Sequence, residues 1–364
     1  MSTPLASRAE ILGLSLERLT ETLAPFVDRP FRARQVFAQL HHRGASSFEE
    51  MSDVAAEIRL RLAEHFTVSR PELVECRASD DGTAKYLLRL ADGASIETVD
   101  IPDGERRTLC ISSQAGCGLA CAFCVTGHWG AGRSLTAAEI VGQVHEVRRL
   151  AALPPGLNLV FMGMGEPLLN LDALHDAIEL LSETISPRRI TVSTAGVVPG
   201  IEALGRWSRR PNLAVSLHAP DDERRTRLMP INRTWPIDSL LAALRRYPLE
   251  PRRRITIEYL LLDGFNDARP DADALAHRLD GLRVKVNLIP FNPDPVLPAW
   301  MGRPAPARVE AFRDRLESAG FTATVRRQRG DDVAAACGQL RAFARAPRGG
   351  AARRRFEAFR PTPR

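Results

Sequence analysis

The stretch LCISSQAGCGLACAFC, residues 109–124, decides the fold because it joins a β-rich run to three closely spaced cysteines. From residue 108 onward, short apolar β-rich runs alternate with stretches of helical periodicity. The six runs are TLCISSQ, NLVFMGM, RITVSTAG, NLAVSLHA, ITIEYLLLD and RVKVNLIPF. This alternation predicts an α/β protein with a parallel sheet and outer helices. Six runs indicate an open, partial (β/α)6 barrel rather than a closed eight-stranded one, with functional residues at the carboxyl ends of the strands.

Cys117, Cys121 and Cys124 have the spacing C-x3-C-x2-C, directly after the first β-rich run. Three thiolates on one loop can bind three irons of a 4Fe–4S cubane, and the fourth iron then has no protein ligand. S-adenosylmethionine (SAM) could chelate that open iron through its amino and carboxylate groups. The alternative is a zinc site. It would need a fourth ligand such as His128, because no second CxxC pair occurs.

The parts of the chain that flank the barrel have different patterns. Residues 1–70 contain three segments with helical apolar spacing and predict a small helical accessory domain. Residues 71–107 contain short alternating segments separated by the turn signals DDGT and ADG, and they predict a β-hairpin extension. The barrel is predicted for residues 108–340, where a further strand-like run, TATVRRQRG, comes before Cys337 in a loop or short helix.

Length and composition favour a globular cytoplasmic protein. With 364 residues, of which 44% are hydrophobic, the chain can bury the core of one large domain and a smaller one. We expect no membrane association, because the N-terminus lacks an export signal and no run of about 18 apolar residues is free of charge. Three of the six cysteines fall within eight residues. This indicates a metal or redox site rather than a disulfide scaffold.

Positive charge is concentrated at the C-terminal end. The net charge is +6, and residues 341–364 hold eight arginines and one glutamate. Because these arginines are mixed with Gly and Pro, the segment is predicted to be a disordered tail. It would be either a solvated end or an arm that contacts RNA phosphates.

The cysteine spacing at the first strand of a parallel half-barrel resembles the radical SAM superfamily. More narrowly, from about residue 30 to residue 340 the chain is similar to the RlmN and Cfr family of radical SAM RNA adenine methyltransferases, and it is more similar to the RlmN branch. The segments that carry the resemblance are PFRARQVF, ETVDIP, LCISSQAGCGLACAFC, VFMGMGEPLLN, TVSTAGVVPG, SLHAPDDERR, NLIPFNP and RGDDVAAACGQL.

This resemblance implies a SAM-dependent RNA (adenine-C2-)-methyltransferase of the radical SAM type. The implied substrate is carbon 2 of an adenine in 23S rRNA, with tRNA as a second candidate substrate. The stretch VTGHWGAGRSLT, after the cysteines, departs from the usual RlmN pattern. A Cfr-like adenine C8 methyltransferase therefore remains an alternative.

The resemblance also implies a SAM-binding set at the strand ends. The segment GMGEP, residues 163–167, closes the second strand and is similar to the Gly-Gly-Glu element that holds the SAM amino group. Matching positions follow the third, fourth and sixth strands. The residues implied are Gly165, Glu166, Ser193, Ser216, Leu217, His218 and Asn292. Any one of them could simply cap a helix, but all are expected at one rim of the barrel.

Three further residues are implied in catalysis. In the family pattern, Cys337 is methylated by one SAM, and a second SAM supplies the radical that activates this methyl group, so two SAM are used per turnover. The activated carbon adds to adenine, Glu97 removes the ring proton, and Cys110 attacks the sulfur of Cys337 to form a disulfide. From the residues alone, buried cysteines are as often inert, and a strand glutamate is usually solvent-facing.

The implied chemistry requires partners. The target adenine must leave its base stack, so RNA with a flipped or unpaired base is expected. A reducing electron donor such as flavodoxin or ferredoxin is also expected, and the sequence carries no signal for an oligomeric state. Two rivals remain open. One is a radical SAM enzyme for another RNA, a small molecule or a peptide, for which Cys110 and Cys337 would be dispensable. The other is a non-catalytic zinc-containing RNA-binding protein.

Overall fold

A ten-stranded sheet organises the protein. The computed structural model describes residues 8–154, 156–330 and 332–340, so the predicted Arg-rich tail, residues 341–364, lies outside the described residues. The strand order is β12-β11-β10-β9-β8-β7-β6-β5-β4-β3. The strands are β3 (Glu72–Ala78), β4 (Ala84–Arg89), β5 (Ser95–Asp103), β6 (Arg106–Cys110), β7 (Asn158–Phe161), β8 (Ile190–Thr194), β9 (Asn212–Ser216), β10 (Ile255–Leu261), β11 (Val284–Pro290) and β12 (Ala323–Val325).

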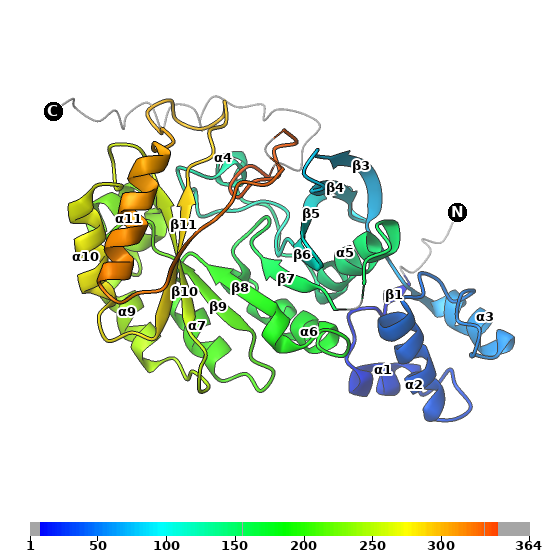
Figure 1. The fold of residues 1–364 in the computed structure, drawn as a ribbon. Helices are drawn as coiled ribbons and strands as arrows, with labels where there is room; N and C mark the ends of the chain where they lie inside the picture. Colours follow the sequence, from blue (N-terminus) through cyan, green and yellow to red (C-terminus); the bar gives the residue numbers. More distant parts are fainter. Residues whose placement is uncertain (1–7, 155, 331, 341–364) are drawn as a thin grey trace.

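Strands β6 to β12 are parallel and carry helices on their outer side (Figure 1). The helices are α4 (Val125–Trp129), α5 (Ala137–Leu150), α6 (Leu171–Leu181), α7 (Val198–Gly205), α8 (Asp222–Leu228), α9 (Ile237–Arg246), α10 (Arg269–Leu279) and α11 (Pro306–Ser318), with 3-10 turns η2 (Pro167–Leu169), η3 (Pro187–Arg189) and η4 (Pro230–Arg233). Among the residues described, no helix is both long and apolar enough to cross a bilayer.

The predicted open α/β barrel is confirmed, with one addition. All six predicted runs form neighbouring parallel strands, and the order ends at β12 and β3 without closing. The run TATVRRQRG contributes a seventh parallel strand, because β12 pairs with β11 at Val286↔Ala323.

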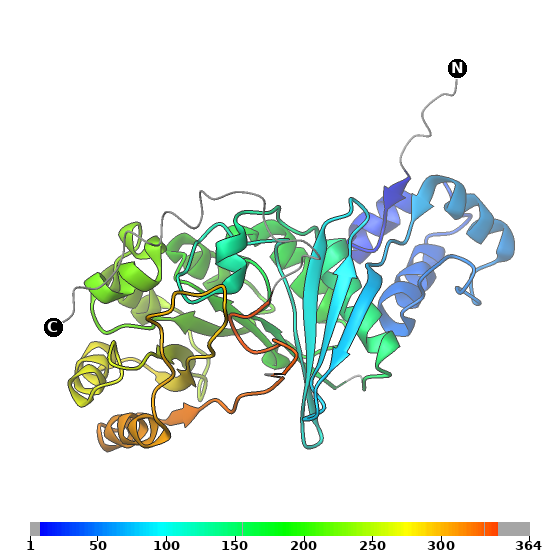
Figure 2. The ribbon, with the colours of Figure 1, turned by 90° about the horizontal axis from the view of Figure 1, so that it is seen from above.

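The antiparallel strands are continuous with the barrel sheet. Strands β3, β4 and β5 form the predicted hairpins, and β5 then pairs with β6 at Val99↔Cys110. On its other side β6 pairs with β7 at Cys110↔Val160. Because paired residues point to the same side of a sheet, the hairpins and the barrel share one face, which we name the interior face. Figure 2 shows β3 to β5, in cyan, standing beside the parallel strands.

The N-terminal segment is mostly helical, as predicted, and lies next to α5 (Figure 1). Its elements are β1 (Ala9–Glu10), α1 (Leu16–Leu23), α2 (Phe31–Ala38), the π-helix η1 (Gln39–Arg43), α3 (Ala56–His65) and β2 (Phe66–Thr67). The segment packs closely against α5 of the barrel. At Gly13 there is no room for a side chain, because a Cβ added there would be 2.7 Å from the backbone nitrogen of Ala138. The rings of His41 and His145 also meet across this boundary, 5.9 Å apart.

Arg225 of α8 holds the ends of two barrel strands together. Its side chain is fully buried. Its Nη2 donates to the carbonyl oxygens of Ala195 at 2.7 Å and Ser216 at 3.2 Å, and its Nη1 donates to Oδ1 of Asn232 at 2.6 Å. A buried guanidinium is tolerated only when such acceptors satisfy it.

We therefore expect Arg225→Met to lower the free energy of unfolding by about 3 kcal/mol, because three buried acceptors would lose their donor. Urea unfolding would measure the change. Arg245→Met is the matched control, since Arg245 is exposed on α9, and it should change stability by less than about 0.5 kcal/mol. Equal stability of the two variants would contradict this role of Arg225.

Candidate active site

The three cysteines of the C-x3-C-x2-C motif lie on a tightly clasped loop after β6. A Cβ added at Gly132 would be 1.6 Å from the carbonyl oxygen of Ala115. Gly116 has φ +130°, a region that favours glycine, and a Cβ there would be 2.6 Å from the nitrogen of Gly132. The backbone N–H of Cys117 donates to the carbonyl oxygen of Gly130 at 3.0 Å. The glycines thus let two backbone segments cross in contact and fix the start of the motif.

Cys117, Cys121 and Cys124 line one cavity of about 160 Å3, which we name the cysteine cavity. Burial raises the pKa of the Cys117 thiol to about 12 and also raises the pKa of Cys121 and Cys124. In the described residues, no three His, Cys, Asp or Glu side chains form a group that could hold a single metal ion. A cubane uses each cysteine on a different iron, so three thiols around one cavity fit a 4Fe–4S cluster. Metal binding would deprotonate them.

Glu166 projects from the end of β7 into the same cavity. Its Oε1 accepts from the N–H of Leu168 at 3.0 Å, and its Oε2 accepts from the N–H of Ala195 at 2.7 Å. Burial raises its pKa to about 6. Gly165 beside it has φ +98°, and a Cβ there would be 2.5 Å from that of Gln114. The backbone therefore approaches the cysteine loop closely, and a buried carboxylate faces the cavity.

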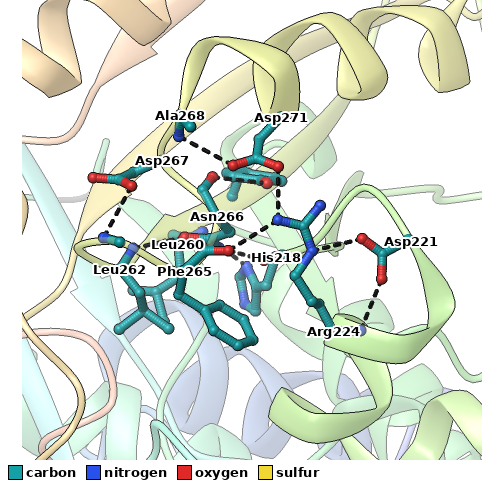
Figure 3. Close-up of polar contacts among 12 residues, drawn as sticks. His218, Asp221, Arg224, Leu260, Leu262, Phe265, Asn266, Asp267, Ala268 and Asp271 are labelled. Carbon is teal, nitrogen blue, oxygen red and sulfur yellow. Dashed lines mark hydrogen bonds and ion pairs between the residues drawn. The ribbon is translucent and has the colours of Figure 1, made fainter. Parts of the chain in front are cut away.

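His218 is held in an unusual conformation at the end of β9. Its φ is +62°, which is rare for a residue other than glycine. Figure 3 shows the contacts that hold it: Nδ1 of His218 accepts from the N–H of Leu260 at 3.1 Å, and Nδ2 of Asn266 donates to the His218 carbonyl oxygen at 2.7 Å. Nearby, Arg224 donates to Asp221 and Asp271, each at 2.6 Å, and so ties α8 to α10.

The imidazole of His218 is neutral and offers a donor. Burial lowers its pKa to about 3. Because Nδ1 accepts a backbone N–H, the ring proton is on Nε2. The ring lies edge-on to Phe123, with 4.8 Å between centroids, and His218 lines the cysteine cavity together with Ser193 and Ser216.

Cys337 lies in a loop, residues 332–340, that is tied to both the cysteine loop and the barrel. On its C-terminal side, the N–H of Val125 donates to the carbonyl oxygen of Gly338 at 2.7 Å. Nε2 of Gln339 donates to the carbonyl oxygen of Pro293 at 3.0 Å. The thiol lines the cysteine cavity and also a second cavity of about 560 Å3, which we name the basic cavity. Cys337 therefore stands between the two cavities.

Cys110, at the end of β6, is buried close to Cys337. Burial raises the pKa of the Cys110 thiol to about 12, and the charge of Cys337 adds to this shift, so the two sulfurs are near neighbours. Both cysteines are free thiols here, as are the other four.

The basic cavity is bounded by charged side chains from several segments. Its lining includes Asp103, Arg303, Arg326, Arg327 and Arg329. Arg327 is exposed, and Arg329 lies 3.5 Å from Asp103. Positive charge therefore exceeds negative charge around this cavity, which suits a polyanion.

Four of the implied residues do not line the cysteine cavity: they are Cys110, described above, Asn292, Leu217 and Glu97. Asn292 faces the basic cavity, where its Oδ1 accepts from Nη1 of Arg303 at 3.1 Å. Leu217 is buried, and its N–H donates to the carbonyl oxygen of Glu258 at 3.0 Å. Glu97 is only 3% exposed and lines neither cavity; it pairs with a buried lysine.

Two cavity residues were missed in the sequence. Glu258, on β10, lines the cysteine cavity, and its Oε2 accepts from Nδ2 of Asn287 at 2.7 Å. Arg326, after β12, lines both cavities, and attraction to Cys337 raises its pKa. A signal was present for both: each is a charged residue within or directly after a strand-like run, ITIEYLLLD for Glu258 and TATVRRQRG for Arg326.

Comparison with known proteins agrees with this geometry. The profile of the radical SAM superfamily matches residues 111–276, and that of the ribosomal RNA large subunit methyltransferase N-terminal domain matches residues 9–68. A dual-specificity RNA methyltransferase RlmN of Syntrophobacter fumaroxidans is 50% identical, over 91% of this chain and 97% of the relative. One from Halorhodospira halophila is 49% identical, over 91% and 93%.

A solved structure extends the likeness to three dimensions. The crystal structure of a radical SAM methyltransferase from Sphaerobacter thermophilus superimposes with a TM-score of 0.87 at 43% identity, and the match covers 92% of this chain and 100% of the other. The accessory segment, the cysteine motif and the barrel are thus all shared with known relatives. The chain belongs to the RlmN family of RNA methyltransferases within the radical SAM superfamily.

Proposed function

We propose that this enzyme methylates carbon 2 of an adenine in 23S rRNA, with tRNA as a second substrate, and that Cys337 carries the methyl group. The single observation that carries the proposal is the place of Cys337, which lines both the cysteine cavity and the basic cavity. A side chain there can exchange a group with a small molecule on one side and with RNA on the other. The name of the relatives, dual-specificity RNA methyltransferase, supports two RNA substrates.

Membership of the superfamily implies a 4Fe–4S cluster and SAM. Cys117, Cys121 and Cys124 would hold the cluster. The remaining polar lining, which comprises Glu166, Ser193, Ser216 and the Nε2–H of His218, would bind and orient SAM. When bound, the cluster supplies the electron that cleaves SAM to a radical able to abstract a hydrogen atom.

A methyl carrier is needed because of the chemistry of the ring. Carbon 2 of adenine is an sp2 centre without an adequate nucleophilic lone pair, so a direct polar transfer of a methyl cation to it is not feasible. The thiolate of Cys337 can accept the methyl group by displacement and then present it to the ring. Two SAM are used per turnover under this proposal, one as methyl donor and one as radical source.

Glu97 and Cys110 would finish the reaction. Once Cys337 is joined to the ring through the methylene carbon, Glu97 takes the proton from carbon 2. The thiolate of Cys110 then attacks the sulfur of Cys337, and the bond between that sulfur and the methylene carbon breaks. This forms a transient disulfide between the two cysteines, and the released carbon takes up a proton to become the methyl group of the product. The nearness of the two buried thiols supports this step. A reducing electron donor such as flavodoxin or ferredoxin would supply the electron for SAM cleavage, and a two-electron thiol reductant would return the disulfide to two thiols.

The basic cavity would receive the target adenine. Carbon 2 is inaccessible in a stack, so the base must be extruded toward Cys337. The arginines that border the cavity would contact the flanking phosphates, which position the RNA without reading its sequence.

Mass spectrometry of RNA tests the proposal. A deletion strain should lose 2-methyladenosine from 23S rRNA and tRNA, and wild type, but not Cys337→Ala, should restore it. Loss of 8-methyladenosine instead would assign the protein to the Cfr-like reaction. Unchanged levels of both nucleosides would refute RNA adenine methylation.

Replacing Cys110 should trap the enzyme on its substrate. Without the resolving thiol, Cys110→Ala should accumulate RNA covalently attached through Cys337, visible as a shifted band on a denaturing gel. Cys76→Ala is the matched control, because Cys76 is exposed on β3 and far along the sheet from the cavities. A Cys110→Ala enzyme that turns over normally would rule out its resolving role.

Arg327 should contribute to RNA affinity. Arg327→Met removes one exposed cation beside the basic cavity, so binding should weaken roughly fivefold, and the slope of log K against log salt should fall by about 1. Filter binding at several salt concentrations would measure both. Arg245→Met on α9 should leave both quantities unchanged. An unaltered slope for Arg327→Met would exclude a phosphate contact.

A further inference from the structure

Lys85 is a chemically unusual residue in this chain. Of 50 basic residues, only Lys85 and Lys285 are lysines. Lys285 is exposed, whereas Lys85, the second residue of β4, is 5% exposed. A lysine ammonium is a compact charge with three rotatable donors, whereas a guanidinium is a planar fork. The buried cation on β4 is therefore one of the two lysines in a chain whose other basic residues are arginines.

The ammonium of Lys85 binds two oxygens. Its Nζ lies 3.2 Å from Oε1 of Glu97, and both side chains are almost fully buried. The same Nζ donates to the carbonyl oxygen of Ala334 at 3.0 Å. Ala334 has φ +50°, an uncommon left-handed conformation for alanine. Lys85 thus joins the base proposed above to a backbone atom three residues before Cys337.

The strand register places this pair beside Cys110. Lys85 pairs with Val99, and Val99 pairs with Cys110, so all three lie on the interior face. Glu97 is two residues from Val99 on β5 and has the same orientation. Lys85 and Glu97 are therefore diagonal neighbours, a spacing that long side chains can bridge.

Further contacts hold the Cys337 loop against the β3–β4 hairpin. Oγ of Ser79 donates to Oδ1 of Asp332 at 2.5 Å, and the N–H of Gly330 donates to Oδ2 of Asp81 at 3.1 Å. A Cβ added at Gly330 would be 2.8 Å from the side chain of Thr83. Of these hydrogen bonds, the Lys85–Ala334 bond is the one made by a buried side chain, and that side chain also contacts Glu97.

Two cations of the described residues interact with Glu97, namely Lys85 and Arg77. From β3, Arg77 interacts with it electrostatically, but Arg77 is exposed and paired with Glu75 at 2.8 Å. The thiol of Cys110 lies on the same face. Lys85 is a buried cation in contact with Glu97, and such a contact favours the ionised form of a buried carboxylate.

We propose that Lys85 is a positioning residue that holds Glu97 ionised and fixes it beside the Cys337 loop. This inference rests on the proposed function, in which Glu97 must accept a proton from the adenine ring. A glutamate that is already protonated cannot act as that base. Lys85 keeps it available at neutral pH, and the shared Ala334 contact keeps it next to the thiol that carries the substrate.

The positive charge of Lys85 determines how activity should depend on pH when Lys85 is replaced. Removing the ammonium of Lys85 raises the pKa of Glu97, because burial favours the neutral acid. A base works above its pKa. A Lys85→Met enzyme should therefore be impaired at neutral pH and recover as the pH rises, whereas a purely structural defect would not recover.

The first measurement reads Glu97 without turnover. Infrared difference spectra at pH 7 should show the carbonyl stretch of a protonated carboxyl group in Lys85→Met. The band should be absent in wild type and in the double variant Lys85→Met/Glu97→Gln. Lys85→Gln is the second variant, because it keeps a donor for Ala334 without the charge, and it should show the same band. Absence of the band in both single variants overturns the proposal.

The second measurement follows single-turnover decay of the protein–RNA adduct. At pH 7, Lys85→Met should slow the decay roughly tenfold while Cys337 still becomes methylated, and Lys85→Arg should be less impaired. Lys285→Met is the matched control and should behave as wild type. In a Glu97→Gln background, adding Lys85→Met should change the decay less than twofold, because Lys85 acts through Glu97.

The outcomes separate the two proposals. Additive effects of the Lys85 and Glu97 substitutions, or a defect in Lys85→Met that does not depend on pH, overturn the role of Lys85. A wild-type enzyme that makes no methylated adenine overturns the proposed function instead. In that case the carboxyl band still decides whether Lys85 holds Glu97 ionised.

Discussion

The pairing of β5 with β6 is the interaction on which the site depends. It joins an antiparallel hairpin to a parallel barrel at Val99↔Cys110 and gives both one interior face. Without it, Glu97 and Lys85 would belong to a separate surface extension. With it, the groups proposed for proton removal and disulfide formation lie on adjacent strands. Backbone hydrogen bonds, rather than side-chain contacts, therefore set their relative positions.

The loop at residues 332–340 completes the site from the opposite end of the chain. It is tied on one side to the hairpin through Lys85 and Ser79, and on the other side to the cysteine loop through Val125. Besides these hydrogen bonds, Ala335 and Leu340 of the loop pack into the hydrophobic core. In the proposed reaction the thiol of Cys337 would face SAM and then RNA, and the two cavities that this loop lines meet at Cys337.

The charged side chains around the two cavities differ in their burial. Around the cysteine cavity, buried groups are neutral or satisfied: His218 is uncharged, and Glu166 accepts two backbone N–H groups. Around the basic cavity, arginines are partly exposed and can meet a polyanion. The buried pair Lys85–Glu97 lines neither cavity, and its two charged groups are in contact with each other.

The sequence by itself determined the parts that depend on local order. The spacing of Cys117, Cys121 and Cys124 is a property of one loop, and strand–helix alternation predicted the barrel because periodicity reflects which side chains are buried. Only the tertiary structure decided the rest. It placed Asn292 in the second cavity, buried Glu97 against Lys85, and brought Arg326 to both cavities. These relations depend on strand register and on contacts across more than 200 residues, for which local periodicity contains no information.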